Sequence, residues 1–165
     1  MAELNAALAA NREAVTALIV AAERSAGTWT TPRAEGKWSP SQVVEHVARA
    51  LEESAHVVSG TPSKFPTLPS IMRPLLRGMF FNRALRTNVF PKGRTSKAFN
   101  PDAGPASPAA ARERLESALT TFDHACRAQS PRGTCVSTVF GTLSVADYAQ
   151  FQAMHTRHHC GQMQA

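Results

Sequence analysis

The sequence predicts an all-α protein built as a four-helix bundle. Apolar residues recur at helical spacing in four segments of about 20 residues each. A serine that can cap a helix stands at the start of three of them, at Ser39, Ser107 and Ser144. The 165 residues suffice for one core, so residues 1–165 are interpreted as a single domain. A proline-rich segment at about 61–106 is interpreted as a long crossover between helices two and three.

The first two helices are predicted in the N-terminal third of the chain. The first extends over about residues 2–24, where leucine, valine and isoleucine recur at helical spacing among alanines. The second begins at Ser39, because Pro40 suits the first helical position and Gln42 completes an S-x-x-Q capping box. It continues to Gly60, a residue type that commonly ends helices.

The crossover is interrupted repeatedly by proline but retains some helical pattern. Apolar residues and arginines alternate over residues 71–85, which predicts one or two short helices there. The third long helix begins at Ser107, because this serine precedes Pro108, and extends to about Arg127.

The chain between the third and fourth helices is predicted to be extended. Residues 135–141 are rich in β-branched side chains and end at Gly141, which favours a strand or a loop over a helix. The fourth helix begins at Ser144, with Asp147 placed to accept hydrogen bonds from its first turn. It extends to about Gln162.

Positive charge is concentrated in the crossover. The net charge is +6, yet residues 54–101 contain no acidic residue. Their basic residues are Lys64, Arg73, Arg77, Arg83, Arg86, Lys92, Arg94 and Lys97. Three interpretations are open for this basic segment 64–97: its arginines recognise an anionic substrate, it is a solvated loop, or it is an arm that contacts a second subunit.

The composition excludes several classes of protein. Three cysteines without a Cys-x-x-Cys pair indicate neither a disulfide framework nor a zinc ribbon. No basic leader and no apolar run of about 18 residues is present, which predicts a cytoplasmic protein without membrane contact. No helix-turn-helix, zinc-finger or RNA-binding motif accompanies the basic residues, which argues against nucleic acid as a partner.

Three histidines are the candidate metal ligands. His155 and His159 stand four residues apart on a predicted helix, which places both imidazoles on one face. His46, on the second helix, lies on or beside an apolar stripe and is the best candidate for a third ligand. Three imidazoles make the open site of a catalytic divalent metal, with positions left for water and substrate. Thr156 follows His155, so the H-E-x-x-H motif of zinc proteases is absent.

Two further residues are candidates for a supporting role. Glu53 lies two helical turns beyond His46 and is the best-placed carboxylate for a base or an outer ligand; the alternative is a solvated Glu52-Glu53 pair. Gln162, three residues after His159, could orient that imidazole, or it could be an exposed glutamine at a helix end.

Two motifs resemble those of DinB-like proteins. Residues 38–47, W-S-P-S-Q-V-V-E-H-V, are similar to the W-S-x-x-Q/E-x-x-x-H opening of helix two in that superfamily. Residues 140–144, followed by the H-x-x-H-H-x-x-Q pattern of residues 155–162, are similar to its loop and final helix. The superfamily also includes YfiT-type proteins, proposed to be metal hydrolases, and the metal-binding domain of mycothiol-dependent maleylpyruvate isomerase.

The resemblance implies an up-up-down-down bundle, often a homodimer, with a nickel- or zinc-type ion held by three histidines. Matched by motif, these ligands are His46, His155 and His159. The leading hypothesis is therefore a metal-dependent hydrolase or thiol-cofactor transferase with a small-molecule substrate. Its nucleophile is a metal-bound water or a substrate thiolate, and a low-molecular-weight thiol is a candidate cofactor. The alternative is a non-enzymatic stress-response or binding module whose basic segment contacts nucleic acid or an anionic surface.

Overall fold

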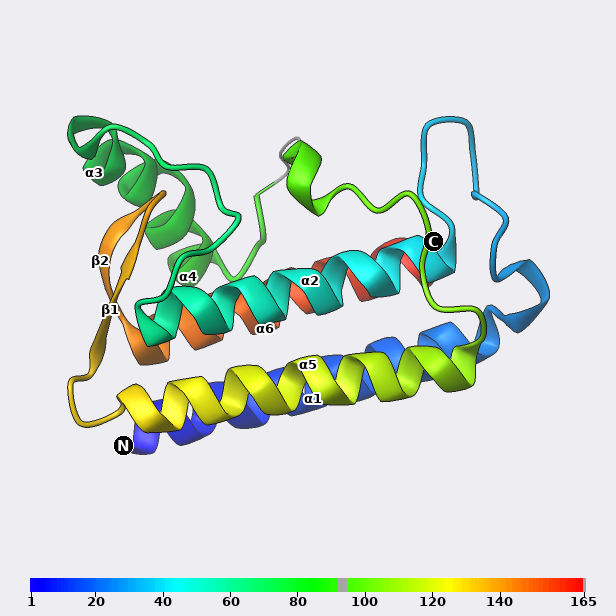
Figure 1. Cartoon of the computed structure of the whole chain (residues 1–165), viewed down its shortest axis with the longest axis horizontal. Coiled ribbons are helices and arrows are strands. Elements are labelled where there is room, and N and C mark those ends of the chain that lie inside the picture. Colours follow the sequence, from blue (N-terminus) through cyan, green and yellow to red (C-terminus); the bar gives the residue numbers. More distant parts are fainter. Residues whose placement is uncertain (92–94, 165) are drawn as a thin grey trace.

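The computed structural model describes residues 1–91 and 95–164. Lys92 and Arg94, which belong to the basic segment 64–97, lie outside the described residues. The chain is mostly helical and has one small sheet of two strands. Four long helices lie side by side along the long axis of the molecule (Figure 1). They are α1 (Ala2–Arg24), α2 (Pro40–Ser59), α5 (Pro108–Gln129) and α6 (Val145–Gln164).

The long helices do not follow the predicted up-up-down-down order. The amide of Ser41 donates to the carbonyl of Trp29 at 3.1 Å, which holds the start of α2 near the end of α1. Glu23, in the last turns of α1, pairs with Arg112 in the first turns of α5 at 2.6 Å, so these helices are antiparallel. Figure 1 shows α1 and α6 running one way and α2 and α5 the other. The predicted order is wrong because residues 25–39 reverse the chain after α1.

Helices α2 and α5 run parallel to each other, and the crossover is the connection that joins them. Two parallel neighbours require the chain to return along about 30 Å of helix, which only a long connection can do. The prediction of short helices over residues 71–85 is confirmed, with a π-helical turn in the middle. The crossover elements are η2 (Ser70–Met72), α3 (Arg73–Leu76), the π-helical η3 (Arg77–Asn82), α4 (Arg83–Thr87) and η4 (Lys97–Phe99).

The predicted helix starts are confirmed by their caps. At α2, the Ser39 hydroxyl accepts from the Gln42 amide at 3.4 Å, and the Gln42 side chain accepts from the Ser39 amide at 2.9 Å. At α5, the Ser107 hydroxyl accepts from the Ala110 amide at 3.2 Å. Each cap satisfies amides that have no partner within the helix, which fixes where the helix begins. A further short helix, η1 (Ala26–Thr28), follows α1.

A β-hairpin connects α5 to α6, where the sequence predicted one extended segment. Its strands are β1 (Thr134–Ser137) and β2 (Gly141–Ser144), and Cys135 lies opposite Leu143. Gly141 has a φ of 78°, a conformation that favours glycine. Ser144 ends β2, and its hydroxyl accepts from the Asp147 amide at 3.3 Å, so it caps α6 as predicted. Four-residue strands are too short to show a clear alternation in the sequence.

The core lies between the four long helices. The side chains of Leu8, Leu18, Val47, Leu51, Leu115 and Phe122 are fully buried there. The crossover adds to this core, because Phe81 and Phe99 are also buried. Within the described residues, no helix combines the length and the hydropathy needed to cross a membrane.

Candidate metal centre

The three predicted ligand histidines lie at one point between α2 and α6. Nε2 of His155 lies 3.1 Å from Nε2 of His46 and 3.1 Å from Nε2 of His159. One ligand atom from each of the three lies within 4.8 Å of the others, a spacing that could hold a metal ion. We call His46, His155 and His159 the histidine cluster.

The helices bring the cluster together through their register. His155 and His159 are one turn apart on α6, so their side chains share a face. The antiparallel packing of α2 on α6 places His46 against this face. Two turns further along, the Tyr148 hydroxyl donates to the Ser54 hydroxyl at 3.2 Å in the core. These two polar contacts fix how α2 and α6 are aligned.

Hydrogen bonds on the outer nitrogens orient two of the rings. Nδ1 of His46 lies 2.8 Å from the carbonyl oxygen of Phe99, and Nδ1 of His159 lies 2.9 Å from Oε1 of Gln162. Both oxygens can only accept, so both Nδ1 atoms carry hydrogen. The lone pairs of the two Nε2 atoms therefore face the shared point. This is the arrangement in which metal-ligating histidines are held in proteins.

The donor set of the cluster fits a divalent ion. His155 Nε2 carries at most one proton, which can satisfy only one of its two neighbours, so acceptor capacity is left over within the cluster. Metal–nitrogen bonds of about 2.0–2.1 Å place neighbouring ligand nitrogens about 2.8–3.4 Å apart in octahedral or tetrahedral geometry. The two separations from His155 Nε2, 3.1 Å each, fall in that range, and the three ligand atoms all lie within 4.8 Å of one another.

Burial keeps the imidazoles neutral. Burial, together with the neighbouring His46, lowers the pKa of His159 to about 3. Burial also lowers the pKa of His155 well below its usual value, with the two other histidines of the cluster adding to the shift. The pKa of His46 is lowered by burial, in part opposed by its hydrogen bond to Phe99. A neutral imidazole is the form that binds a metal.

A large pocket opens over the histidine cluster. Its volume is about 1060 Å³, and the three histidines line it. Aromatic side chains make much of its wall: Trp38, Phe65, Phe80, Phe90, Phe99, Phe140 and Phe151. The Trp38 ring lies 4.6 Å from that of His46 and 6.0 Å from that of His159. Among the described lining residues no aspartate or glutamate occurs, and the ionised ones are Arg33 and Lys37.

The segment that carries the Phe99 carbonyl is fixed to the start of α2. The indole of Trp38 donates to Oδ1 of Asn100 at 2.8 Å, and the Gln42 amide group donates to the Pro101 carbonyl at 3.0 Å. At Gly104 an added Cβ would lie 1.9 Å from the carbonyl oxygen of Ser41, so only glycine permits this approach. The crossover thereby holds the hydrogen-bond partner of His46 in place.

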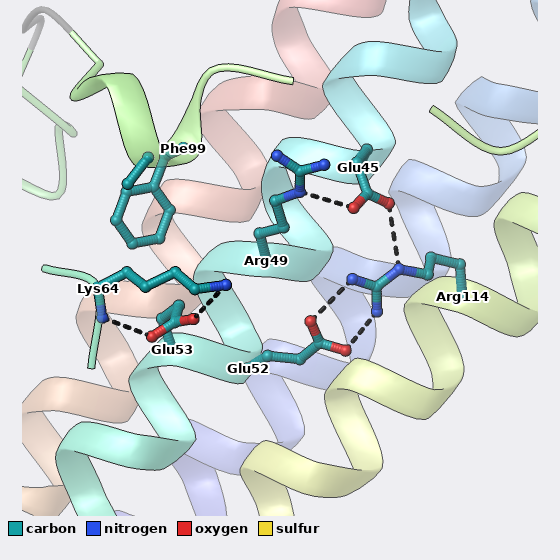
Figure 2. Close-up of a pocket in the computed structure, with 8 residues that line it drawn as sticks. Glu45, Arg49, Glu52, Glu53, Lys64, Phe99 and Arg114 are labelled. Atoms are coloured by element: carbon teal, nitrogen blue, oxygen red, sulfur yellow. Dashed lines mark hydrogen bonds and ion pairs between the residues drawn. The ribbon is translucent and has the colours of Figure 1, made fainter. Parts of the chain in front are cut away.

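Gln162 lies at the histidine cluster, whereas Glu53 does not line its pocket. The Glu53 carboxylate accepts from the Lys64 amide at 2.7 Å and pairs with Nζ of Lys64 at 3.5 Å. It lines a separate pocket of about 400 Å³ on the other side of Phe99 (Figure 2). Gln162 contacts His159 through Oε1, and its Nε2 lies 3.0 Å from Nε2 of His158.

The described lysines and arginines of the basic segment 64–97 do not line the histidine pocket. The crossover does form part of the pocket wall, but with the apolar side chains of Leu76, Phe80 and Phe90. The guanidinium of Arg73 donates to the Leu68 carbonyl at 2.9 Å, and that of Arg77 donates to the Thr142 carbonyl at 2.9 Å. These arginines support the crossover and the hairpin.

Sequence reasoning missed three contributors to the site: the Phe99 carbonyl, Arg33 and Lys37. All three lie outside the long helices, where no periodic pattern indicates which face a residue presents. The only available signal for Arg33 and Lys37 was their place directly before the Trp38 motif.

Comparison with known proteins gives one match, to a family. A family model described as the DinB superfamily matches residues 3–163. No curated protein and no solved structure matches the chain.

Proposed function

The chain belongs to the DinB superfamily, and from this premise we propose that it is a metal-dependent enzyme of the four-helix-bundle type. His46, His155 and His159 hold a divalent ion of the zinc or nickel type. One observation carries the proposal: in the lining of a large pocket, Nε2 of His155 lies 3.1 Å from Nε2 of both His46 and His159.

Each residue of the site has a separate task in this proposal. When bound, a divalent ion supplies a Lewis acid and lowers the pKa of a bound water or thiol. The three ligand imidazoles are neutral, so they leave the charge of the site uncompensated and favour an anionic partner. Phe99 and Gln162 keep the rings of His46 and His159 turned toward the shared point. The aromatic wall excludes water from the reacting groups.

The lining of the pocket favours group transfer over hydrolysis. Hydrolysis by general-base catalysis commonly uses a carboxylate, and none lines the described part of the pocket. A thiol whose pKa is lowered at the site would lose its proton to solvent water, so the resulting thiolate would need no protein base. We therefore favour transfer involving a low-molecular-weight thiol, with metal-dependent hydrolysis as the second reaction to test.

A non-enzymatic binding module is the less supported alternative. Its case rests on the basic segment 64–97, yet Lys64, Arg73 and Arg77 all bind groups of the protein itself. No contact in the described residues favours a role in nucleic-acid binding over a role in supporting the crossover.

A screen of the metal-loaded protein tests the proposed function. Zinc- and nickel-loaded samples are assayed against small electrophiles and esters, each with and without a panel of low-molecular-weight thiols. We expect turnover that requires a thiol and is lost in His155→Ala. Turnover without thiol would identify a hydrolase. Activity equal in His155→Ala and wild type would contradict a role for the histidine cluster, and His124→Ala, which alters an exposed histidine on α5, is the matched control.

A further inference from the structure

The histidine pocket has an uneven distribution of charge. Its described cations are Arg33 and Lys37, and neither an aspartate nor a glutamate lines its described part. Both cations belong to residues 25–39, the connection between α1 and α2. This connection lies at the end of the molecule where α6 also ends (Figure 1). One end of the pocket is therefore suited to an anion.

Arg33 is anchored close to the histidine cluster. Its Nη1 donates to the carbonyl oxygen of Gln162 at 2.7 Å, and the side chain of that same glutamine accepts from His159 Nδ1 at 2.9 Å. The guanidinium is thus connected to a ligand histidine through one residue. A guanidinium held by one arm has further N–H donors, arranged in a plane that suits a carboxylate.

The rest of the pocket is suited to an apolar group. Several of its phenylalanines lie close together: the ring of Phe151 lies 5.1 Å from that of Phe90 and 5.8 Å from that of Phe140. A volume of about 1060 Å³ is at the upper end of the range for small-molecule sites. A small, wholly polar substrate would leave these rings facing water, whereas an apolar body would cover them.

We propose that the pocket binds a carboxylate with a bulky apolar or aromatic body. The carboxylate lies at Arg33 and Lys37, and the body lies against the phenylalanines. As a statement about the substrate, this inference rests on the proposed function. The binding preference itself depends on two cations and an apolar wall, so it can be measured without the metal.

Matched ligands of equal size test the inference. The metal-free protein is titrated at neutral pH with 2-naphthoate and with 2-naphthamide, which differ in charge but hardly in shape. We expect the wild type to bind the carboxylate about 10-fold or more tightly than the amide, because charge-assisted hydrogen bonds are the stronger ones. In the double variant Arg33→Gln/Lys37→Gln the preference falls to about 2-fold, and the amide affinity is unchanged.

Two controls make the result specific. Arg86→Gln removes one positive charge from an exposed site on α4 outside the pocket, and it should keep the full preference. Lys37→Gln alone serves if loss of the Arg33 anchor disturbs folding, which circular dichroism detects; it should reduce the preference by part of the double effect. Equal binding of the two ligands by wild type, or a preference that survives the double variant, would overturn the inference.

Metal analysis separates this inference from the proposed function. Should the wild type retain no metal while the carboxylate preference depends on Arg33 and Lys37, the metal proposal fails and the ligand class stands. Should metal be retained by the wild type and lost in His155→Ala while both ligands bind equally, the ligand class fails and the metal proposal stands.

Discussion

Helix α2 carries two clusters of polar side chains on different sides, and the two clusters differ in how their polar atoms are paired. Toward α5 lies the ion-pair cluster, made of Glu45, Arg49, Glu52 and Arg114 (Figure 2). Toward α6 lies the histidine cluster. The first consists of opposite charges that bind one another, whereas the second consists of neutral imidazoles whose nitrogens converge on one point.

The ion-pair cluster is complete in itself. The guanidinium of Arg114 donates from Nη2 to Glu52 at 2.8 Å and from Nε to Glu45 at 3.1 Å, while Arg49 also donates to Glu45 at 2.7 Å. Hydrogen bonds to Glu52, and then to Glu45, raise the pKa of Arg114, against the effect of burial. The cluster therefore joins α2 to α5 and leaves no strong demand for a ligand.

In our proposal, the histidine cluster is completed by a cation. Its nitrogens are close enough to share one ion, and two of them are fixed by outer hydrogen bonds. The difference between the two clusters indicates that neither charge nor the polarity of the pocket lining identifies the candidate functional site in this protein. The useful criterion is whether the polar atoms of a cluster satisfy one another.

The largest expected effect is on metal affinity when a ligand is removed. His46→Ala should weaken binding of Zn²⁺ or Ni²⁺ by more than about 100-fold, since loss of an outer partner alone costs 10–100-fold. Titration against a chromophoric chelator measures this. The exposed-histidine variant His124→Ala should bind as tightly as wild type; a comparable loss in His124→Ala would mean that the metal binds elsewhere.

Acid should destabilise the metal-free protein through the histidine cluster. The pKa of His159 is about 3 in the folded state against an ordinary 6.5, so between these values the unfolded chain binds more protons. Stability is therefore full above about pH 6.5 and is lost as the pH falls, by about 2–3 kcal/mol at pH 4.5 from this group. Urea unfolding at pH 7.5 and 4.5 measures it.

The matched variant for the acid experiment is His159→Gln, which removes the titrating group. Its free energy of unfolding should fall less between pH 7.5 and 4.5 than that of the wild type. An equal fall in both proteins would assign the acid sensitivity to other groups.

Removal of Arg114 from the ion-pair cluster should lower the free energy of unfolding and leave the metal affinity unchanged. Arg114→Ala leaves Glu45 and Glu52 without their shared partner, and we expect a loss of about 1–2 kcal/mol because the cluster is only partly buried. Urea unfolding of the metal-free protein gives this value, and the metal affinity should stay within about 2-fold of wild type. A large loss of metal affinity would show that the two clusters are coupled through α2.

The smallest effect is expected for the residue that orients a ligand. Gln162→Ala removes the acceptor for His159 Nδ1 and should weaken metal binding by about 10-fold. The same titration measures it, and unfolding at neutral pH should change little because the side chain of Gln162 lies near the end of α6. Unchanged affinity would mean that His159 is held by packing alone.

The sequence was sufficient for the long helices and for the histidine cluster. The starts of α2 and α5 combined a capping side chain, Ser39 or Ser107, with an apolar stripe, so local chemistry determined them. Helical spacing predicted that His155 and His159 share a face. His46 was assigned to the same site because it is the histidine of the motif that begins at Trp38. These features depend on neighbours close in the sequence or on one face of a helix.

The sequence could not give the features that depend on distant packing. The direction of α2 depends on how residues 25–39 fold, and these residues carry no regular pattern. Glu53 shares the helical face expected for a base, yet Lys64 binds its carboxylate. The Phe99 carbonyl is a backbone group, so no side-chain motif could indicate it. Tertiary contacts decided each of these features.

Elemental analysis of protein purified without an affinity tag tests the central claim most directly, when wild type, His155→Ala and Arg114→Ala are compared. If the histidine cluster binds the metal ion and the ion-pair cluster does not, wild type and Arg114→Ala should each carry about one zinc or nickel ion per chain. His155→Ala should carry almost none. Folded wild type that takes up no ion even when zinc or nickel is added in excess, or an equal metal content in wild type and His155→Ala, would contradict the account.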